Sequence, residues 1–248
     1  MYWQKRCLKN VIYLYKYENM FKSKNVYIYV MGEGYMITVY VLRTDRDLSQ
    51  NEYCYLSEMV SSDKREQLGK FSRYEDAQRT LLGDVLLRCA LKERYGMLNS
   101  EIVFRANEFS KPYLQNCPDI HFNISHSKKY VACAASLSPV GIDVEAIGKM
   151  DMRIADRFFT QQEKQYIVGY SNEEQQRAFY HIWTRKEAYI KREGKGLQTP
   201  LSTINVLEPI NNIYFHLIFE NYEAICNVCS CESISPTISY PTLDSLFV

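Results

Sequence analysis

Two long helical segments, each preceded by strand-like runs and ended by a glycine, constrain the fold more than any other feature of the sequence. Residues 74–96 carry apolar side chains at positions 81, 82, 85, 86 and 89, with acids in the first turn. Residues 172–194 form a second such segment, with Gly194 as its end. An amphipathic helix needs another layer to cover its apolar stripe. The chain is therefore expected to contain two helix-covered layers.

The remaining segments supply the sheets for these helices. Shorter helices are expected over residues 63–71 and 151–170. Strands are expected at 36–42, 101–114, 120–147, 213–219 and 222–230. Each half then holds a strand, a long helix and further strands, which predicts an α+β fold of two similar halves. Each half is expected to be a small antiparallel sheet packed against a long helix. The join lies near Ser138, which gives predicted halves of 36–137 and 138–248.

Residues 1–35 are rich in Tyr, Lys and Asn and show no helical periodicity. Gly32-Glu33-Gly34, when back-translated, permits a purine-rich ribosome-binding sequence just before Met36. We therefore interpret residues 1–35 as an upstream extension without functional importance. The alternative is a real hairpin, because residues 26–42 contain two β-rich runs around a Gly-Glu-Gly turn.

Composition excludes several classes of function. The 248 residues include 30 basic and 29 acidic side chains, so no overall field attracts nucleic acid or a membrane. No stretch reaches the ~18–20 apolar residues of a membrane span, and no secretory signal is present. A cytoplasmic protein with reduced thiols is expected. Cys226 and Cys229 lack a second ligand pair, so buried strand residues on opposite faces are favoured over a zinc site.

The segment GIDVE alternates aliphatic and acidic residues. On a strand, Asp143 and Glu145 leave the same face while Ile142 and Val144 enter the core. Two neighbouring carboxylates repel each other unless a cation lies between them. A half-exposed edge strand is the simpler interpretation when this segment is taken alone.

The segment WTRKEAYIKREGKGL places Trp183, Glu187 and Lys191 in one row along a helix. Glu187 and Lys191 could form an ordinary solvated ion pair. Alternatively, Glu187 is a third carboxylate facing Asp143 and Glu145, which together suit Mg²⁺. Lys191 would then lie near a phosphate on that ion.

Several other polar residues are candidates for binding an anion. Ser125 and His126 lie where a strand enters a turn, and no nucleophile elbow supports a serine hydrolase. They suit phosphate binding, although His126 fits a structural role equally well. Lys64, Arg79 and Lys111 lie near predicted helix starts or kinks, where solvated surface charges are common.

Taken together, YEDAQRTLLGDVLLR, KPYL, FNISHS, GIDVE and WTRKEAYIKREGKGL resemble, in order and spacing, the Sfp-type 4′-phosphopantetheinyl transferases. The resemblance runs from about Met36 to the final strands and is closest to the Bacillus members that serve peptide synthetases. It implies a pseudo-dimer of two α+β halves with coenzyme A in the cleft between them. It also implies transfer of the phosphopantetheine arm to a serine of a peptidyl or acyl carrier protein, with release of 3′,5′-ADP.

The resemblance also assigns roles to residues. Asp143, Glu145 and Glu187 match the family's Mg²⁺ ligands, with Mn²⁺ as a substitute, and Glu187 and Lys191 match its catalytic pair. A further set matches its contacts to coenzyme A: Lys64, Arg79, Lys111, Ser125, His126 and Lys191. Two positions depart from the family: Gln67 stands where relatives often have a basic residue, and Ser110 where close relatives have glycine. A monomer is expected.

Two alternatives from other classes remain open. A metal-dependent nuclease or phosphodiesterase also combines acidic ligands with a lysine, although its lysine usually follows the acid by two residues on a strand. A non-catalytic module that binds carrier domains would keep the surface and lack the chemistry. The near-zero net charge argues against a nucleic-acid substrate.

Overall fold

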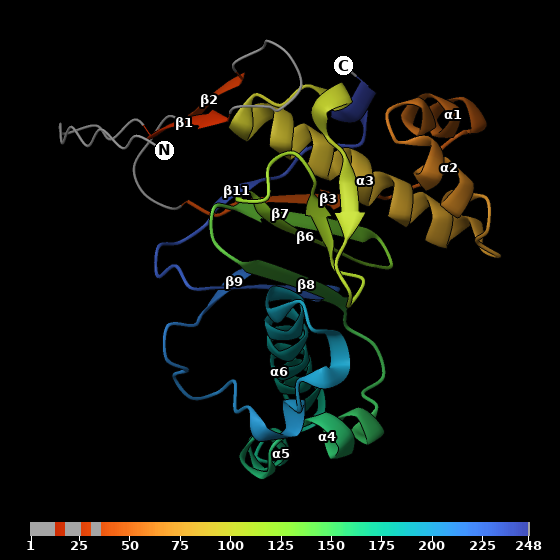
Figure 1. Cartoon of the computed structure of the whole chain (residues 1–248). Helices are drawn as coiled ribbons and strands as arrows, with labels where there is room; N and C mark the ends of the chain where they lie inside the picture. The colour runs from red at the N-terminus through yellow and green to blue at the C-terminus, as the bar shows by residue number, and fades with distance from the viewer. Residues whose placement is uncertain (1–12, 18–25, 31–35, 248) are drawn as a thin grey trace.

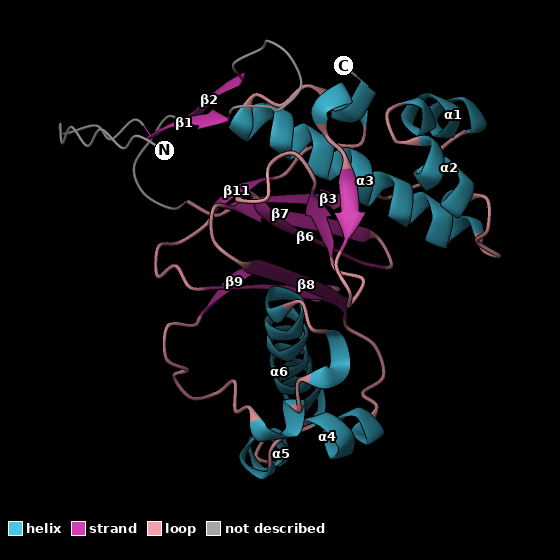
Figure 2. Cartoon of the chain, in the orientation of Figure 1, coloured by secondary structure: helices cyan, strands magenta, loops and turns pink. Residues whose placement is uncertain are grey.

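The computed structural model describes residues 13–17, 26–30 and 36–247. Two sheets lie next to each other in the middle of the molecule, with one long helix on the outer side of each (Figure 1). Figure 2 shows the same arrangement by secondary structure, with helices above and below the strands. The α+β fold predicted from the sequence is confirmed.

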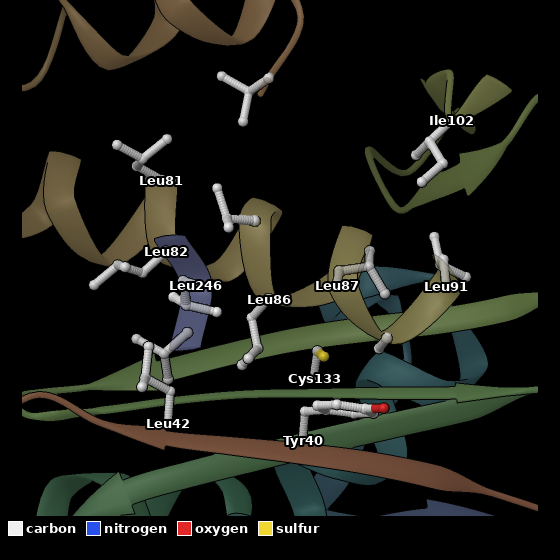
Figure 3. Close-up of a cluster of buried hydrophobic side chains, with 14 of the residues drawn as sticks. Tyr40, Leu42, Leu81, Leu82, Leu86, Leu87, Leu91, Ile102, Cys133 and Leu246 are labelled. Atoms are coloured by element: carbon white, nitrogen blue, oxygen red, sulfur yellow. The ribbon is translucent and has the colours of Figure 1, made fainter. Parts of the chain in front are cut away.

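The first half is built around α3 (Tyr74–Tyr95) and a four-stranded sheet of order β11-β3-β7-β6. Its strands are β3 (Thr38–Arg43), β6 (His121–Ser127), β7 (Tyr130–Ser136) and β11 (Thr237–Ser239). Leucines on one face of α3 pack against the sheet, and Figure 3 shows them opposite Tyr40, Leu42 and Cys133. Residues 81–88 are all buried, so α3 is covered on more than the one face that the periodicity of residues 74–96 predicts.

The second half repeats this plan with α6 (Asn172–Glu193) and a three-stranded sheet of order β8-β10-β9. Its strands are β8 (Val140–Ala146), β9 (Tyr214–Glu220) and β10 (Ala224–Ser230), all antiparallel. In each half the first strand pairs with the last one, and the last pairs with the one before it. The orders β3-β7-β6 and β8-β10-β9 are therefore equivalent, as a pseudo-dimer requires.

The two long helices also end alike. Both have 22 residues and stop at a glycine in the left-handed region, Gly96 with φ 66° and Gly194 with φ 69°. The short helices that precede them end at Gly69 and Gly169, each with φ −67° and ψ −12°. The predicted pseudo-dimer is confirmed by this repeated local geometry.

A central apolar core lies between the two sheets. Ile142 and Val144 of β8 point into it together with Val39 of β3 and Cys226 of β10. Alternation along β10 places Cys229 on the other face, so the two buried cysteines face opposite sides, as predicted. The same alternation turns Asp143 and Glu145 away from this core.

Short elements complete the two halves. The helices are α1 (Gln50–Glu58), α2 (Ser62–Leu68), α4 (Met152–Phe158) and α5 (Gln161–Val168), and a hairpin joins β4 (Phe104–Ala106) to β5 (Pro112–Leu114). Short 3₁₀ turns occupy Asn99–Glu101, Gly196–Gln198, Leu201–Thr203 and Asp244–Phe247. The single helix expected over 151–170 is divided in two. Phe159 is extended, and Thr160 starts α5 with a capping box to Glu163.

The chain ends differ from the expectations. Strand β2 (Val26–Val30) pairs with β1 (Tyr13–Tyr17), so the β-rich runs of 26–42 are strands but do not form a hairpin with each other. The rest of the proposed extension 1–35 lies outside the described residues.

At the other end, β11 returns to the first half and pairs parallel to β3. The first sheet is therefore not purely antiparallel, and part of the predicted half 138–248 packs on the other half.

The two sheets meet where β6 and β8 lie side by side, joined by side chains of β6. The Asn123 Oδ1 accepts a hydrogen bond from Ile142 N at 2.9 Å. The Ser125 Oγ accepts from Val144 N at 3.2 Å, and the Ser127 Oγ from Ala146 N at 3.0 Å. Alternate residues of one strand thus satisfy alternate N–H groups of the next. We call this set of three bonds the β6–β8 ladder.

Helix α6 approaches β8 very closely at Gly141. A Cβ atom at this glycine would lie 2.0 Å from Ala188 O and 2.4 Å from Arg192 N, both of which belong to the helix backbone. Only glycine allows this approach. On the next strand, Asn227 Nδ2 donates to Thr184 Oγ1 of α6 at 2.8 Å.

We predict that Gly141→Ala lowers the free energy of unfolding by about 1–3 kcal/mol or more, because backbone must move to admit the methyl group. Urea unfolding measures the change. Gly148→Ala is the matched control, since its Cβ would meet only Tyr180 Oη, at an ordinary 3.5 Å. Equal stability of the two variants would contradict the close approach.

Candidate active site

A pocket of about 340 Å³ lies where the two halves meet. Five elements contribute to its wall: α2, α3, β6, β8 and α6. The lining residues are Lys64, Thr80, Asp84, Ile124, Ser125, His126, Asp143, Glu145, Glu187 and Lys191. All the predicted site residues are among them except Arg79 and Lys111.

Asp143 is the most deeply buried of the acids that line the pocket, with 2% of its surface exposed. Its Oδ1 accepts hydrogen bonds from Ser125 Oγ at 2.9 Å and from Lys191 Nζ at 2.5 Å. Its Oδ2 is buried and has no hydrogen-bond partner among the described residues. A buried carboxylate oxygen without a partner is costly, so this atom marks a position where a further ligand would be stabilising.

Glu145 leaves the same face of β8 as Asp143. Its Oε2 accepts a hydrogen bond from Ser127 Oγ at 2.9 Å. Burial, followed by the negative charge of Asp143, raises the pKa of Glu145 to about 7. The carboxylate of Asp143 therefore lies close enough to oppose the ionisation of Glu145.

Glu187 and Lys191 come from α6, one helical turn apart. Burial and then the charge of Asp143 raise the pKa of Glu187, while Lys191 acts in the opposite direction. Lys191 Nζ also donates to Ser125 Oγ at 3.0 Å. Helix α6 thus brings the carboxylate of Glu187 and the ammonium of Lys191 to β6 and β8, next to its close approach at Gly141.

Trp183, the first member of the predicted row, lies elsewhere. Its ring packs against Phe158 and Phe159, with centroid distances of 5.7 and 6.3 Å, in the apolar cluster of the second half. Trp183 therefore contributes to the apolar packing, whereas Glu187 and Lys191, further along α6, line the pocket.

A fully buried ion pair supports the neighbouring turn of α6. Lys186 Nζ lies 2.8 Å from Glu163 Oε2 and donates to the carbonyls of Leu201 and Ile204 at 2.8 and 2.6 Å. Both side chains are wholly buried, and the other oxygen of Glu163 accepts from Val206 N at 2.9 Å. With both charges paired and hydrogen-bonded, this network joins α5 and the 201–206 segment to the helix that presents Glu187.

Lys64 reaches the pocket from α2, with its Nζ 3.9 Å from Asp84 Oδ2. Asp84 in turn accepts from Arg88 Nε at 2.5 Å, and both of these side chains are buried. Sequence reasoning missed Asp84. Asp84 lies four residues before Arg88 on a predicted helix, and this spacing could have identified the ion pair.

His126 lines the pocket, and Arg79 lies beside it without lining the wall. Burial, followed by the positive charges of Arg79 and Lys191, lowers the pKa of His126. Arg79 is engaged by Asp76 Oδ1 at 2.5 Å and by Lys128 O at 3.4 Å. The neighbourhood of His126 is therefore positive, which suits an anionic group.

Lys111 lies outside this pocket. Its Nζ donates to Arg192 O at 3.1 Å and to Val140 O at 3.4 Å, so it covers the end of α6 and lines a different pocket of about 500 Å³. Burial, and then the charge of Arg192, lowers the pKa of Lys111 to about 8. Gly194 leaves room for its stem, because a Cβ there would lie 2.6 Å from Lys111 Cδ.

The turn that carries Lys111 includes Ser110, one of the two departures from the family. Asn107 Oδ1 accepts hydrogen bonds from Phe109 N and Lys111 N at 2.9 and 2.8 Å. Ser110 has a φ of 66°, in the left-handed region that favours glycine. The other departure, Gln67, is exposed on α2 and does not line the pocket.

Sequence reasoning also missed Ser127 and Asn123. Both alternate with Ser125 in FNISHS, and a period of two along a polar face was the signal that could have identified them. The structure shows that this alternation joins the two halves and reaches the carboxylates of β8.

The three carboxylates are of the chemical type that binds a divalent cation, but they are not arranged around a common point. Among the described residues, no group of three or more His, Cys, Asp and Glu side chains stands in a metal-holding arrangement. The ammonium of Lys191 lies against Asp143 instead. The unpartnered Asp143 Oδ2 and the carboxylates of Glu145 and Glu187 are nevertheless hard oxygen donors of the kind that Mg²⁺ prefers. Their sharing of one ion stays a prediction.

Within the described part of the chain, no helix is both long enough and apolar enough to cross a bilayer.

Comparison with known proteins identifies the family. Residues 139–231 match the model of the 4′-phosphopantetheinyl transferase superfamily, and residues 47–138 match the 4′-phosphopantetheinyl transferase N-terminal model. The chain is 43% identical over 168 residues to 4′-phosphopantetheinyl transferase Sfp of Bacillus subtilis. The aligned region covers 68% of this chain and 75% of that protein.

Two further relatives extend this similarity. The 4′-phosphopantetheinyl transferase gsp of Aneurinibacillus migulanus is 34% identical over 227 residues, or 86% of this chain and 92% of the relative. The 4′-phosphopantetheinyl transferase psf-1 of Bacillus pumilus is 41% identical over 148 residues, or 60% of this chain and 64% of the relative. With its repeated α+β halves and these relatives, the chain belongs to the Sfp-like 4′-phosphopantetheinyl transferases.

Proposed function

We propose that this enzyme transfers the 4′-phosphopantetheine arm of coenzyme A to a serine of a peptidyl or acyl carrier protein and releases 3′,5′-ADP. Membership of the transferase family supports the reaction. The observation that carries the assignment of the site is the pocket between the halves, where acids from β8 and α6 meet Lys191, Lys64 and His126.

We further propose that Asp143, Glu145 and Glu187 hold Mg²⁺, which Mn²⁺ replaces. The unpartnered Asp143 Oδ2 supports this choice, as does the charge of Asp143, which raises the pKa of Glu145 and of Glu187. When bound, the ion supplies positive charge that offsets the charge of the reacting pyrophosphate. Because Mg²⁺ prefers octahedral coordination, three protein ligands would leave positions for phosphate oxygens and water.

Glu187 is proposed as the group that removes the proton of the carrier serine. Its pKa is raised by burial and by Asp143, which makes its carboxylate a better proton acceptor than an exposed glutamate. Lys191 lies one turn further along α6 with its ammonium in the pocket. It would stabilise the negative charge of the departing 3′,5′-ADP and donate a proton to it.

The remaining polar residues are proposed to hold coenzyme A. Ser125, His126 and Lys64 line the pocket, and Arg79 adds positive charge next to His126. Lys111 faces a separate pocket beside the end of α6, so any contact that it makes is to a more distant part of coenzyme A. The carrier serine and the phosphopantetheine arm meet where Glu187 and Lys191 lie.

Family membership favours this transferase over a nuclease and over a non-catalytic carrier-binding module. A role with peptide synthetases in antibiotic biosynthesis is proposed because the similar proteins include Bacillus members. The predicted halves 36–137 and 138–248, the cytoplasmic location and the monomeric state stay predictions.

Incubation of the protein with coenzyme A, Mg²⁺ and apo carrier proteins should add one phosphopantetheine group to the carrier serine. Intact-mass spectrometry detects the adduct, and chromatography detects 3′,5′-ADP. A carrier whose serine is replaced by alanine is the control. If peptidyl and acyl carriers both stay unmodified while a known transferase modifies them, the proposed function is wrong.

Glu187→Gln should reduce turnover at least ~10²-fold with the fold intact, which is the usual scale for a positioned acid–base group. Glu173→Gln, in the exposed first turn of the same helix, is the matched control and should keep full turnover. Steady-state rates and circular dichroism measure activity and fold. Near-normal turnover of Glu187→Gln would remove this residue from the mechanism.

Without a divalent cation, stability should depend on the ionisation of Glu145. The folded protein keeps a proton on this group, whose pKa is about 7, while the unfolded chain releases it near the ordinary value of 4.5. The free energy of unfolding should therefore fall as pH rises between these values, by at most about 3 kcal/mol.

Urea unfolding in EDTA at pH 4.5–8 tests this prediction by comparing wild type with Glu145→Gln. The variant should lack this part of the slope. His126 titrates in both proteins and cancels in the comparison. Identical pH profiles would contradict the burial of an opposed carboxylate.

A further inference from the structure

We infer that Ser127 is a positioning residue that holds the carboxylate of Glu145 in the pocket across the junction of the two halves. This inference rests on the proposed function, because it concerns the carboxylates assigned to the metal. Ser127 does not line the pocket itself, so it acts through Glu145.

The hydroxyl of Ser127 makes two bonds at once. Its oxygen accepts from Ala146 N at 3.0 Å, and its proton goes to Glu145 Oε2 at 2.9 Å. The first bond fixes the oxygen against the backbone of β8, one residue beyond the carboxylate. The second bond then fixes the direction of the Glu145 side chain, which would otherwise choose among several rotamers.

Ser125 makes the same pair of bonds two residues earlier. It accepts from Val144 N at 3.2 Å and donates to Asp143 Oδ1 at 2.9 Å. Each carboxylate of β8 therefore has one oxygen engaged by a serine of β6. In Asp143 the second oxygen has no partner in the described part of the chain. The repeated pattern indicates a built arrangement in which the first half orients the acids of the second half.

The serines of the β6–β8 ladder both join the two halves and orient a carboxylate, whereas Asn123 only joins the halves. It accepts from Ile142 N at 2.9 Å, so it joins the halves in the same way as the serines. The residue before Ile142 is Gly141, which has no side chain, so this rung has no carboxylate to orient. A variant at Asn123 therefore tests junction stability alone, whereas a variant at Ser127 tests junction stability and carboxylate orientation.

The experiment measures Mn²⁺ binding by electron paramagnetic resonance for wild type, Ser127→Ala, Ser127→Thr and Asn123→Ala. Loss of a hydrogen bond that orients a metal ligand typically weakens binding about 10–100-fold, so Ser127→Ala should raise the Kd for Mn²⁺ about tenfold or more. Ser127→Thr keeps the hydroxyl and should bind like wild type. Asn123→Ala should be less stable to urea and keep the wild-type Kd.

The Mn²⁺ concentration that gives half-maximal transfer provides a second readout and should rise in the same order. Wild-type affinity in Ser127→Ala, or an equal loss in Asn123→Ala, would overturn the inference and leave the transferase function in place. Wild-type protein that binds no Mn²⁺ and modifies no carrier would overturn both. Urea unfolding verifies that each variant is folded at the assay temperature.

Discussion

The approach of α6 to β8 at Gly141 is the constraint on which the site depends. The helix backbone lies where a side chain of any other residue would stand. Because of this contact, Glu187 and Lys191 reach the strand face that carries Asp143 and Glu145. The apolar residues of β8 are held from the other side by the core between the sheets. Strand β8 is thus held on both faces, and its carboxylates, Asp143 and Glu145, line the narrow pocket between β8 and α6.

Charge in this space is balanced locally. Lys191 compensates Asp143, which also accepts from Ser125, and Ser127 donates to Glu145. Three residues before its closing glycine, α3 carries Glu93 where α6 carries Lys191. Glu93 is exposed and accepts a hydrogen bond from Tyr40 Oη of β3 at 2.5 Å. The two halves share a plan, but this position lines the active-site pocket only in the second half.

The two long helices and the repeated halves could be predicted from the sequence, because periodicity and glycine ends are local signals. Most of the pocket residues were assigned through the resemblance to a known family. The alternation in GIDVE correctly separated Ile142 and Val144 from the two acids. Contacts between distant segments were not predictable in this way. The clamp of Lys111 on α6, the packing of Trp183 and the return of β11 all depend on how the halves dock. Helix 151–170 was wrong as one piece, since the capping signal at Thr160 competes with helical periodicity.

The return of β11 to β3 has a consequence for synthesis on the ribosome. The segment that follows this strand supplies Leu243 and Leu246 to the core of the first half, beside α3. Nearly 200 residues separate these partners along the chain, so the first half cannot close its core while the second half is still being translated. The two halves must then mature together, and the nascent first half is the stage most exposed to chaperones and proteases.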